Sequence, residues 1–129
     1  MPEVARNTFV LKKDIYVKCL VIYPMDEWDR HLEELFNKTN KFNQEHKSFI
    51  REYSKDTAEL ELDANNRLLI PSRFLKLAGI EKDVVLAGQF SQIEIWAKDL
   101  YDQTSMSSEE YSALAEKIMG GNKNNTSAL

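Results

Sequence analysis

The first half of the chain has apolar positions whose spacing predicts two short strands followed by two helices. Strands are predicted over 9–11 and 20–23, and Pro24 ends the second. Asp26 is the predicted N-cap of a helix, because a carboxylate there accepts free N–H groups of the first turn. The apolar face of this helix repeats at i, i+4, i+7 and i+8 and comprises Trp28, Leu32, Leu35 and Phe36. A second helix is predicted from Asn43, with Phe49, Ile50 and Tyr53 buried.

In the second half, the period of the apolar positions changes to two, which predicts a half-buried strand over 58–62. Residues 64–66 interrupt the pattern, and a strand is predicted to resume over 67–70. Pro71 then opens a short helix that Gly79 ends, because proline suits a first helical turn and glycine follows a last one. The apolar face of this helix comprises Phe74, Leu75 and Ala78.

Two further strands, over 83–87 and 93–96, precede the last predicted helix. Ser107 and Glu110 form a capping box, which marks the start of that helix. The side chains predicted to be buried by it are Tyr111, Leu114, Ala115, Ile118 and Met119. A glycine pair stops the helix, and the polar tail, 120–129, is predicted to be disordered.

The two halves resemble each other, which indicates one supersecondary unit used twice. Segment 9–11 matches 84–86 at an offset of 75 residues, and 20–23 matches 93–96 at an offset of 73. Each copy reads as a strand, a polar turn and a strand that ends in an aromatic residue.

The same offset places the first-half counterpart of segment 63–67 before Met1. We therefore expect the first copy to lack that hairpin, through truncation or through loss. The chain is predicted to divide into an incomplete first repeat with connecting helices (1–57), a second repeat with the C-terminal helix (58–119) and the tail (120–129).

Composition narrows the classes of function. The 129 residues suit one domain or two small similar halves. Because 17 Lys and Arg face 21 Asp and Glu, the net charge is −4, and any nucleic-acid binding requires a local basic patch. A single cysteine excludes a disulfide framework and a Cys-only zinc site. No apolar run approaches the roughly 20 residues of a membrane helix, and the N-terminus lacks a secretion signal, which predicts a soluble protein of a reducing compartment.

The segment Asp63-Ala-Asn-Asn-Arg67 is the strongest candidate for a binding site. Asp63 can accept backbone N–H groups and so shape a tight turn, while Asn65 and Asn66 tolerate positive φ and present outward amides. Arg67 offers a planar fork of donors to a phosphate or to the edge of guanine. On spacing alone an ordinary turn with a surface ion pair is the simpler interpretation, because D-x-x-x-R is a weak pattern.

The charge of the residues around this turn slightly favours the binding of DNA. Over 63–82 four basic residues face two acidic ones, in a chain whose total is negative. Arg73 and Lys76 lie on the short helix after Pro71 and could reach phosphates, although exposed cations on a helix more often serve solubility.

Other candidates for chemistry are weaker. His31 and His46 have no partner at ligand spacing, so we expect no metal site. Cys19 reads as a small core residue, and Glu59 and Glu61 as a solvated strand face. We therefore expect neither catalysis nor a cofactor.

Two segments carry a resemblance to a known family: LVIYPMDEW and LDANNRLLIPSRFLKLAGIEKDVVLAGQFSQIEIWAKDLY. Together they span roughly 8–103 and resemble MraZ, a bacterial regulator of the division and cell-wall gene cluster. The resemblance implies an α+β fold built from two AbrB-like swapped hairpins and assembled as a homo-oligomeric ring. It also implies a cytoplasmic, nucleoid-associated protein whose D-x-x-x-R turns contact double-stranded promoter repeats, with no catalysis, cofactor or membrane partner.

The sequence departs from the family pattern in two ways. The first D-x-x-x-R hairpin is absent, and Asn65 and Asn66 stand where the family usually has Gly before the Arg, often with a Lys before it. Because Asn accepts a left-handed backbone, the turn can form, and the missing lysine bears on affinity more than on fold.

These observations predict a sequence-specific DNA-binding transcription regulator in which Arg67 is the main contact. Two alternatives stay open. One is an oligomeric interaction protein of the same fold that no longer binds DNA, suggested by the missing hairpin and the acidic balance. The other is an antitoxin, which would need a longer and more apolar tail than 122–129.

Overall fold

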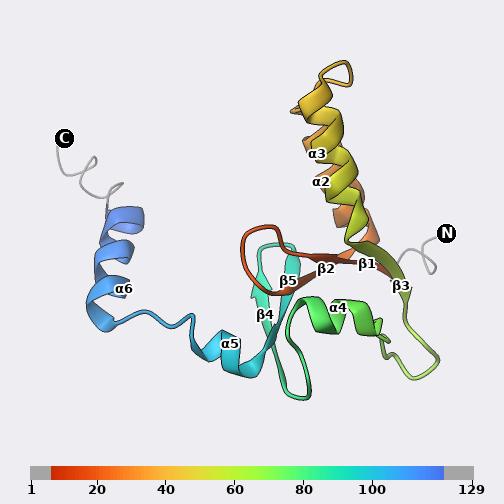
Figure 1. Cartoon of the computed structure of the whole chain (residues 1–129). Coiled ribbons are helices and arrows are strands. Elements are labelled where there is room, and N and C mark those ends of the chain that lie inside the picture. The colour runs from red at the N-terminus through yellow and green to blue at the C-terminus, as the bar shows by residue number, and fades with distance from the viewer. Residues whose placement is uncertain (1–6, 121–129) are drawn as a thin grey trace.

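The computed structural model describes residues 7–120 and contains one open, five-stranded antiparallel sheet (Figure 1). Its strand order is β3-β1-β2-β5-β4. With the helices described below, this arrangement confirms a mixed α+β fold. The strands are β1 (Thr8–Lys13), β2 (Leu20–Pro24), β3 (Thr57–Glu61), β4 (Val84–Gln89) and β5 (Gln92–Ala97).

Helices lie on both sides of the sheet and beyond it. Figure 1 shows α2 and α3 projecting as a hairpin from one side of the sheet, α4 crossing the other side, and α6 standing apart from both. The helices are α2 (Met25–Asn37), α3 (Gln44–Lys55), α4 (Ser72–Leu77), α5 (Lys98–Asp102), α6 (Ser108–Ala115) and the π-helical turn η1 (Glu116–Gly120).

The two similar hairpins, β1–β2 and β4–β5, meet through their second strands. Leu20 pairs with Ile95 and Ile22 pairs with Ile93. At the offset of 73 residues, Leu20 corresponds to Ile93 and Ile22 to Ile95. Exchanging the two hairpins therefore turns each of these pairs into the other. The hairpins are therefore related by an approximate two-fold axis through the middle of the sheet.

The edges of the sheet break this symmetry. β3 precedes β4 and β5 in the chain, yet it pairs with β1 of the first hairpin, Phe9 opposite Leu60. In the described chain, β4 pairs on one side, with β5, and its outer edge is open.

One face of the sheet packs against α4. Leu11, Leu20 and Ile95 contribute from the strands, and Phe74 and Ala78 from the helix, all nearly or fully buried. Their burial confirms two of the three predicted α4 positions, while Leu75 is half-buried. Gly79 ends the helix at a φ of +68°, which favours glycine because other residues are strained there.

The other face packs against α2, which α3 supports. Trp28 contacts Tyr23 of β2 with ring centroids 5.1 Å apart, and it stacks on Tyr53 of α3. Beneath Tyr53 lies Lys12, whose side chain is buried and whose Nζ donates to the Tyr53 carbonyl at 2.9 Å. Aromatic packing and this hydrogen bond together anchor the helical hairpin to the sheet.

The first two helices begin close to the predicted positions, but the predicted cap at Asp26 is wrong. Asn43 caps α3, because its side chain accepts from the His46 N–H at 3.1 Å. Asp26 does not cap α2, since the helix begins at Met25 after Pro24 and Asp26 lies inside the first turn. There its carboxylate accepts from the Glu27 N–H at 3.0 Å.

The predicted strand over 67–70 is wrong. In the described chain this segment is irregular, and Leu69 is 86% exposed. A strand requires hydrogen-bonding partners on a neighbouring strand, and although the outer side of β3 is open in the described chain, the segment bonds to the β3 end of the turn through Asp63 and Arg67 and does not continue along β3. The apolar residues 68–70 instead lead from the turn into α4.

The predicted burial of the last helix is also wrong. The helix and its capping box are confirmed, since Ser107 Oγ accepts from the Glu110 N–H at 3.1 Å. Its large apolar side chains are exposed, however, and Ala115 is half-buried, because α5 has only five residues and holds α6 away from the sheet. Phe49 of α3, also expected to be buried, is 44% exposed. Most of the predicted disordered tail (121–129) lies outside the described residues.

Candidate nucleic-acid interface

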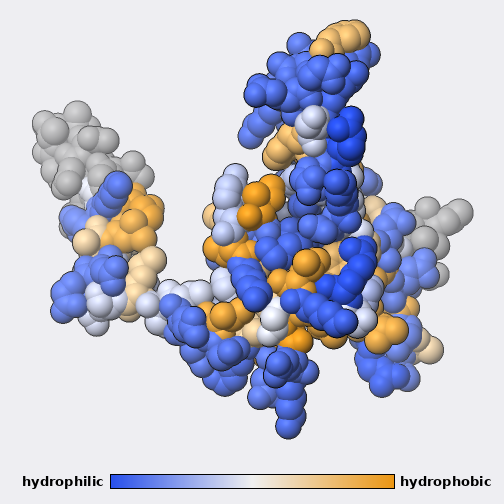
Figure 2. All heavy atoms as spheres, in the orientation of Figure 1, coloured by the Kyte–Doolittle hydropathy of each residue, from blue (hydrophilic) through white to orange (hydrophobic). Residues whose placement is uncertain are grey.

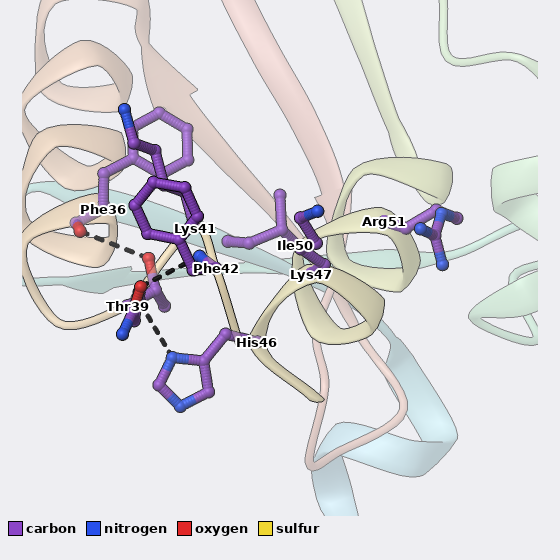
Figure 3. Close-up of a pocket in the computed structure, with 9 residues that line it drawn as sticks. Phe36, Thr39, Lys41, Phe42, His46, Lys47, Ile50 and Arg51 are labelled. Carbon is purple, nitrogen blue, oxygen red and sulfur yellow. Dashed lines mark hydrogen bonds between the residues drawn. The ribbon is translucent and has the colours of Figure 1, made fainter. Parts of the chain in front are cut away.

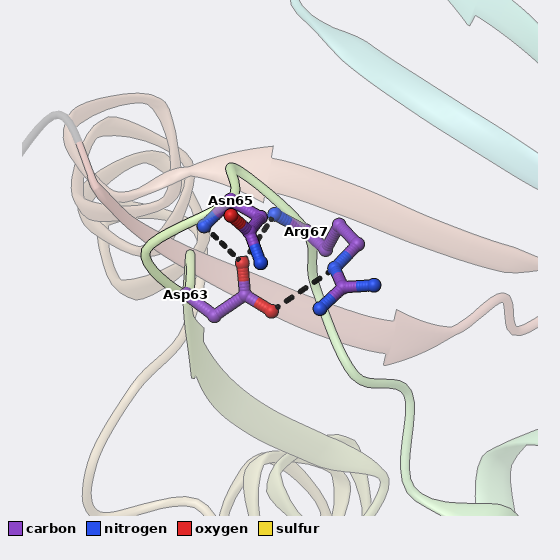
Figure 4. A network of polar contacts seen from close by, with 3 residues as sticks. All are labelled: Asp63, Asn65 and Arg67. Atoms are coloured by element: carbon purple, nitrogen blue, oxygen red, sulfur yellow. Dashed lines mark hydrogen bonds and ion pairs between the residues drawn. The ribbon is translucent and has the colours of Figure 1, made fainter.

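A tight turn after β3 is built around the carboxylate of Asp63 (Figure 4). Asp63 Oδ1 accepts from the backbone N–H of Asn65 at 2.8 Å and from that of Arg67 at 3.0 Å. The Asp63 N–H also donates to the Arg67 carbonyl at 2.9 Å, which closes the loop. The turn therefore has its own hydrogen-bond network, as predicted for Asp63.

Asn66 supplies the reversal of chain direction. Its φ is +60°, and its N–H donates to the Asp63 carbonyl at 3.0 Å. Asparagine is one of the few residues other than glycine that adopts this left-handed conformation at modest cost. The structure thus forms the turn with Asn at the position where glycine would be the default.

Arg67 lies on the surface with its guanidinium oriented by Asp63. Its Nε donates to Asp63 Oδ2 at 3.3 Å, and its side chain is 72% exposed. Within the described chain its two terminal nitrogens have no hydrogen-bond partner. The remaining N–H groups are available to an external acceptor, and the carboxylate limits the rotamers of the side chain.

The electrostatics of the turn follow from the same contacts. The backbone N–H groups of Arg67 and Asn65, in that order, hold the pKa of Asp63 below its usual 3.8. The carboxylate is therefore ionised at neutral pH and continues to organise the loop.

Two other predicted contacts, Arg73 and Lys76, lie on α4 rather than in the turn. The guanidinium of Arg73 sits 4.2 Å from the centre of the Phe74 ring, and its Nη2 approaches the Thr57 carbonyl at 3.5 Å. Lys76 is exposed in the last turn of α4. Within the described residues neither makes a hydrogen bond or ion pair with the turn.

The sequence analysis missed a groove between the facing ends of α2 and α3 (Figure 3). It encloses about 870 Å³. Aromatic residues at positions 36, 42 and 49 are interspersed with basic residues along the segment that forms it, a signal that could have revealed it. The lining residues are Phe36, Thr39, Asn40, Lys41, Phe42, His46, Lys47, Ile50 and Arg51.

Features of other site classes are not found in the part of the chain that the structure describes. No three His, Cys, Asp or Glu side chains gather closely enough there to hold a metal ion. Among the same residues, no helix has the length and apolar character needed to cross a bilayer.

Comparison with known proteins shows the family whose sequences match the region that contains this turn. Residues 55–120, from the end of α3 to η1, match the family described as "MraZ protein, putative antitoxin-like". A protein of Phocaeicola vulgatus named "Transcriptional regulator MraZ" is 39% identical over 120 residues, which cover 93% of this chain and 78% of that protein. The chain belongs to the MraZ family.

Other members of the family give the same result. A "Transcriptional regulator MraZ" from Flavobacterium psychrophilum is 41% identical and covers 87% of this chain and 71% of its own length. One from Clostridium beijerinckii is 38% identical and covers 87% and 78%. The match to the MraZ family includes β3, the turn and α4, so the candidate interface lies inside the shared region.

Proposed function

We propose that the protein is a DNA-binding transcription regulator that contacts promoter DNA with the turn 63–67. The observation that carries the proposal is the exposed Arg67 guanidinium, which Asp63 orients while leaving its terminal nitrogens unpaired in the described chain. The names of the related MraZ proteins, which describe transcriptional regulators, support the same role.

The chemistry of the turn suits a DNA groove. The planar guanidinium of Arg67 can donate in bidentate fashion to a phosphate or to O6 and N7 of guanine. The exposed side chains of Asn65 and Asn66 stand beside it and can donate to phosphates or read base edges. Arg73 and Lys76 on α4 would add phosphate contacts at the flank of the turn.

A single turn makes few contacts, so we infer that several copies act together. The chain has a net charge of −4, which disfavours binding through long-range attraction alone. A homo-oligomeric ring presents several turns on one body and raises the effective concentration for each further contact. The DNA partner would then be an array of promoter repeats, which we place in the division and cell-wall gene cluster, and the protein would act in the cytoplasm at the nucleoid.

We also infer a swapped-hairpin arrangement of two repeats, 1–57 and 58–119. Its support is the pairing of β3 with β1 of the first hairpin rather than with β4 of its own repeat. This exchange places the turn 63–67 at the edge of the sheet next to β1.

The decisive variant is Arg67→Ala. We expect it to abolish the electrophoretic shift of the native upstream region at concentrations that saturate the unaltered protein. The unfolding temperature should be unchanged, because an exposed ion pair contributes little to stability. Binding of Arg67→Ala at normal strength would overturn the assignment.

Arg30→Ala is a matched control. Arg30 is also an exposed arginine paired with a nearby carboxylate, that of Glu27 at 2.8 Å, but it lies on α2 and not in the turn. We expect it to bind normally. If the unaltered protein itself fails to shift the upstream region, the alternative of an interaction protein without DNA binding is favoured instead.

A further inference from the structure

The groove at the tip of the α2–α3 hairpin carries a charge opposite to that of the whole chain. Over 36–51, the segment that contains all of its lining residues, four Lys and Arg residues face one Glu, whereas the net charge of the chain is −4. Three cations line the groove, Lys41, Lys47 and Arg51, and no carboxylate lines it in the described chain. A surface of this kind attracts an anion.

Two aromatic rings in the groove are open to solvent. Phe36 and Phe42 line it and are 53% and 81% exposed. Figure 3 shows both rings on the α2 side of the groove, with Ile50 on the α3 side. Figure 2 shows the tip of the hairpin as a mainly hydrophilic surface with an apolar group at its end. Neither ring belongs to the core, so each can present a flat face to a planar ligand.

The loop that carries Phe42 is held in place by polar contacts. The Phe42 N–H donates to Asn40 Oδ1 at 2.9 Å, and the Asn40 N–H donates to His46 Nδ1 at 2.8 Å. Asn43, the next residue, caps α3. A ring exposed on a loop fixed in this way loses little conformational freedom when it binds a ligand. The groove is therefore organised before any ligand arrives.

The cations are distributed along the groove and are free of ion pairs. Lys47 and Arg51 are exposed and lie one turn apart on α3, about 6 Å along its axis. Lys41 Nζ lies 5.5 Å from the centre of the Phe42 ring. Within the described chain none of the three pairs with a carboxylate. Cations beside exposed aromatic rings are the combination that binds the phosphates and bases of a single strand.

A single-stranded nucleic acid fits this groove better than an acidic helix of a protein. An amphipathic helix buries several side chains in a continuous apolar surface, whereas Ile50 is the one aliphatic side chain that lines the groove in the described chain. A nucleotide needs an exposed flat face for its base and a cation for its phosphate, which Phe42 and Lys41 provide. The bases of a duplex are stacked on one another, so their faces are not available.

We propose that the α2–α3 groove binds single-stranded nucleic acid, with bases stacked on Phe36 and Phe42 and phosphates paired with the three cations. Figure 1 shows the tip of the hairpin projecting away from the turn that follows β3, so a strand in the groove and a duplex at the turn would occupy different parts of the molecule. This site goes beyond the proposed function, because it requires neither Arg67 nor a duplex.

Substitutions at Phe42 are the first test, with labelled oligothymidylate and oligouridylate of about 15 nucleotides as probes in fluorescence anisotropy. Neither probe forms a duplex or offers guanine to the turn. We expect the unaltered protein to bind at least one of them and Phe42→Ala to bind it about tenfold more weakly, with the same circular dichroism spectrum. Phe42→Trp should restore the affinity. Phe42→Leu should not, because leucine is apolar but has no flat face.

Salt dependence tests the cations. If all three neutralise phosphates, the slope of log affinity against log salt should be about −2, and Lys47→Ala combined with Arg51→Ala should reduce it to about −0.7. Lys55→Ala is the matched control, since Lys55 is an exposed cation of α3 outside the groove, and it should leave the slope unchanged. Polyglutamate of equal charge should not displace the strand, because it carries no bases.

Four results would overturn the proposal. They are no binding of either probe, full affinity in Phe42→Leu, displacement of the strand by polyglutamate, and loss of single-strand binding in Arg67→Ala. The third would show that charge alone or an acidic peptide suits the groove, and the fourth that the strand binds at the turn. Phe42→Ala should still shift the promoter duplex, so a failure of this site is distinct from a failure of the turn.

Discussion

At the scale of single residues, the turn 63–67 shows how the proposed binding loop is organised without glycine or lysine. Asp63 holds two backbone N–H groups and the Nε of Arg67, and Asn66 adopts the positive φ that reverses the chain. Asn66 therefore adopts the conformation of the glycine expected from the family pattern. No residue of the turn supplies the positive charge of the expected lysine. This difference explains why we expect the fold of the turn to be secure and its affinity per copy to be modest.

Substitutions at Asn66 test this account. We expect Asn66→Gly to preserve the turn and bind DNA as well as the unaltered protein, because glycine adopts a φ of +60° without strain. Asn66→Val should strain the backbone by about 1–2 kcal/mol and weaken binding, because a β-branched residue is poorly tolerated there. Fluorescence anisotropy on a promoter repeat measures the affinity, and the amide chemical shift of Arg67 reports the turn. Equal binding by both variants would show that this φ is not required.

At the scale of elements, the attachment of the α2–α3 hairpin to the sheet is a mixed aromatic and polar cluster. Trp28 and His31 from α2 and Tyr53 from α3 lie together, and His31 contacts the Tyr53 hydroxyl. Burial lowers the pKa of the Lys12 ammonium beneath Tyr53 and raises the pKa of the Tyr53 hydroxyl. Both shifts show that this environment disfavours charge, so a group of the cluster should weaken the attachment when it becomes charged.

His31 makes that expectation measurable. Burial is the main cause that lowers its pKa below 6.5; Lys12 and Lys38 also lower it, and Glu34 opposes them. The unfolded chain consequently binds a proton at a higher pH than the folded one, so stability is complete above pH 6.5 and declines as the pH falls through that value. We expect the urea midpoint, followed by tryptophan fluorescence, to decrease between about pH 7.5 and 5.5.

The variant His31→Gln should lose most of this pH dependence, whereas His46→Gln, which removes the other histidine, should retain it. A urea midpoint that is independent of pH in the unaltered protein would contradict the assignment of a half-buried, neutral His31.

At the scale of the whole molecule, the sheet joins two hairpins around an approximate two-fold axis while the surfaces outside it are unequal. One side carries the long α2–α3 hairpin and its groove, and the other carries the short α5 and the uncovered α6. Assembly of several copies, as proposed above, would multiply a weak DNA contact.

Arrays of sites provide the test at this scale. We expect the affinity for three promoter repeats spaced by one helical turn to exceed that for a single repeat by about a hundredfold, because later contacts are intramolecular. Affinity should also fall steeply with salt, since each copy contributes phosphate contacts. Shifting the middle repeat by half a turn is the control and should remove most of the gain. Equal affinity for one repeat and for three would argue against multivalent binding.

The sequence by itself determined features that depend on neighbours along the chain. The local features are the β1–β2 and β4–β5 hairpins, the limits of α4 at Pro71 and Gly79, the capping box at Ser107 and the Asp63 turn. They follow from local periodicity, fixed φ preferences and short-range hydrogen bonds. The tertiary structure decided the pairing of β3 with β1, the irregular course of 67–70, the exposure of α6 and the groove between α2 and α3. These features depend on which distant segments come into contact. A pattern of apolar residues predicts that one face of an element is buried, but it does not identify the segment that packs against that face.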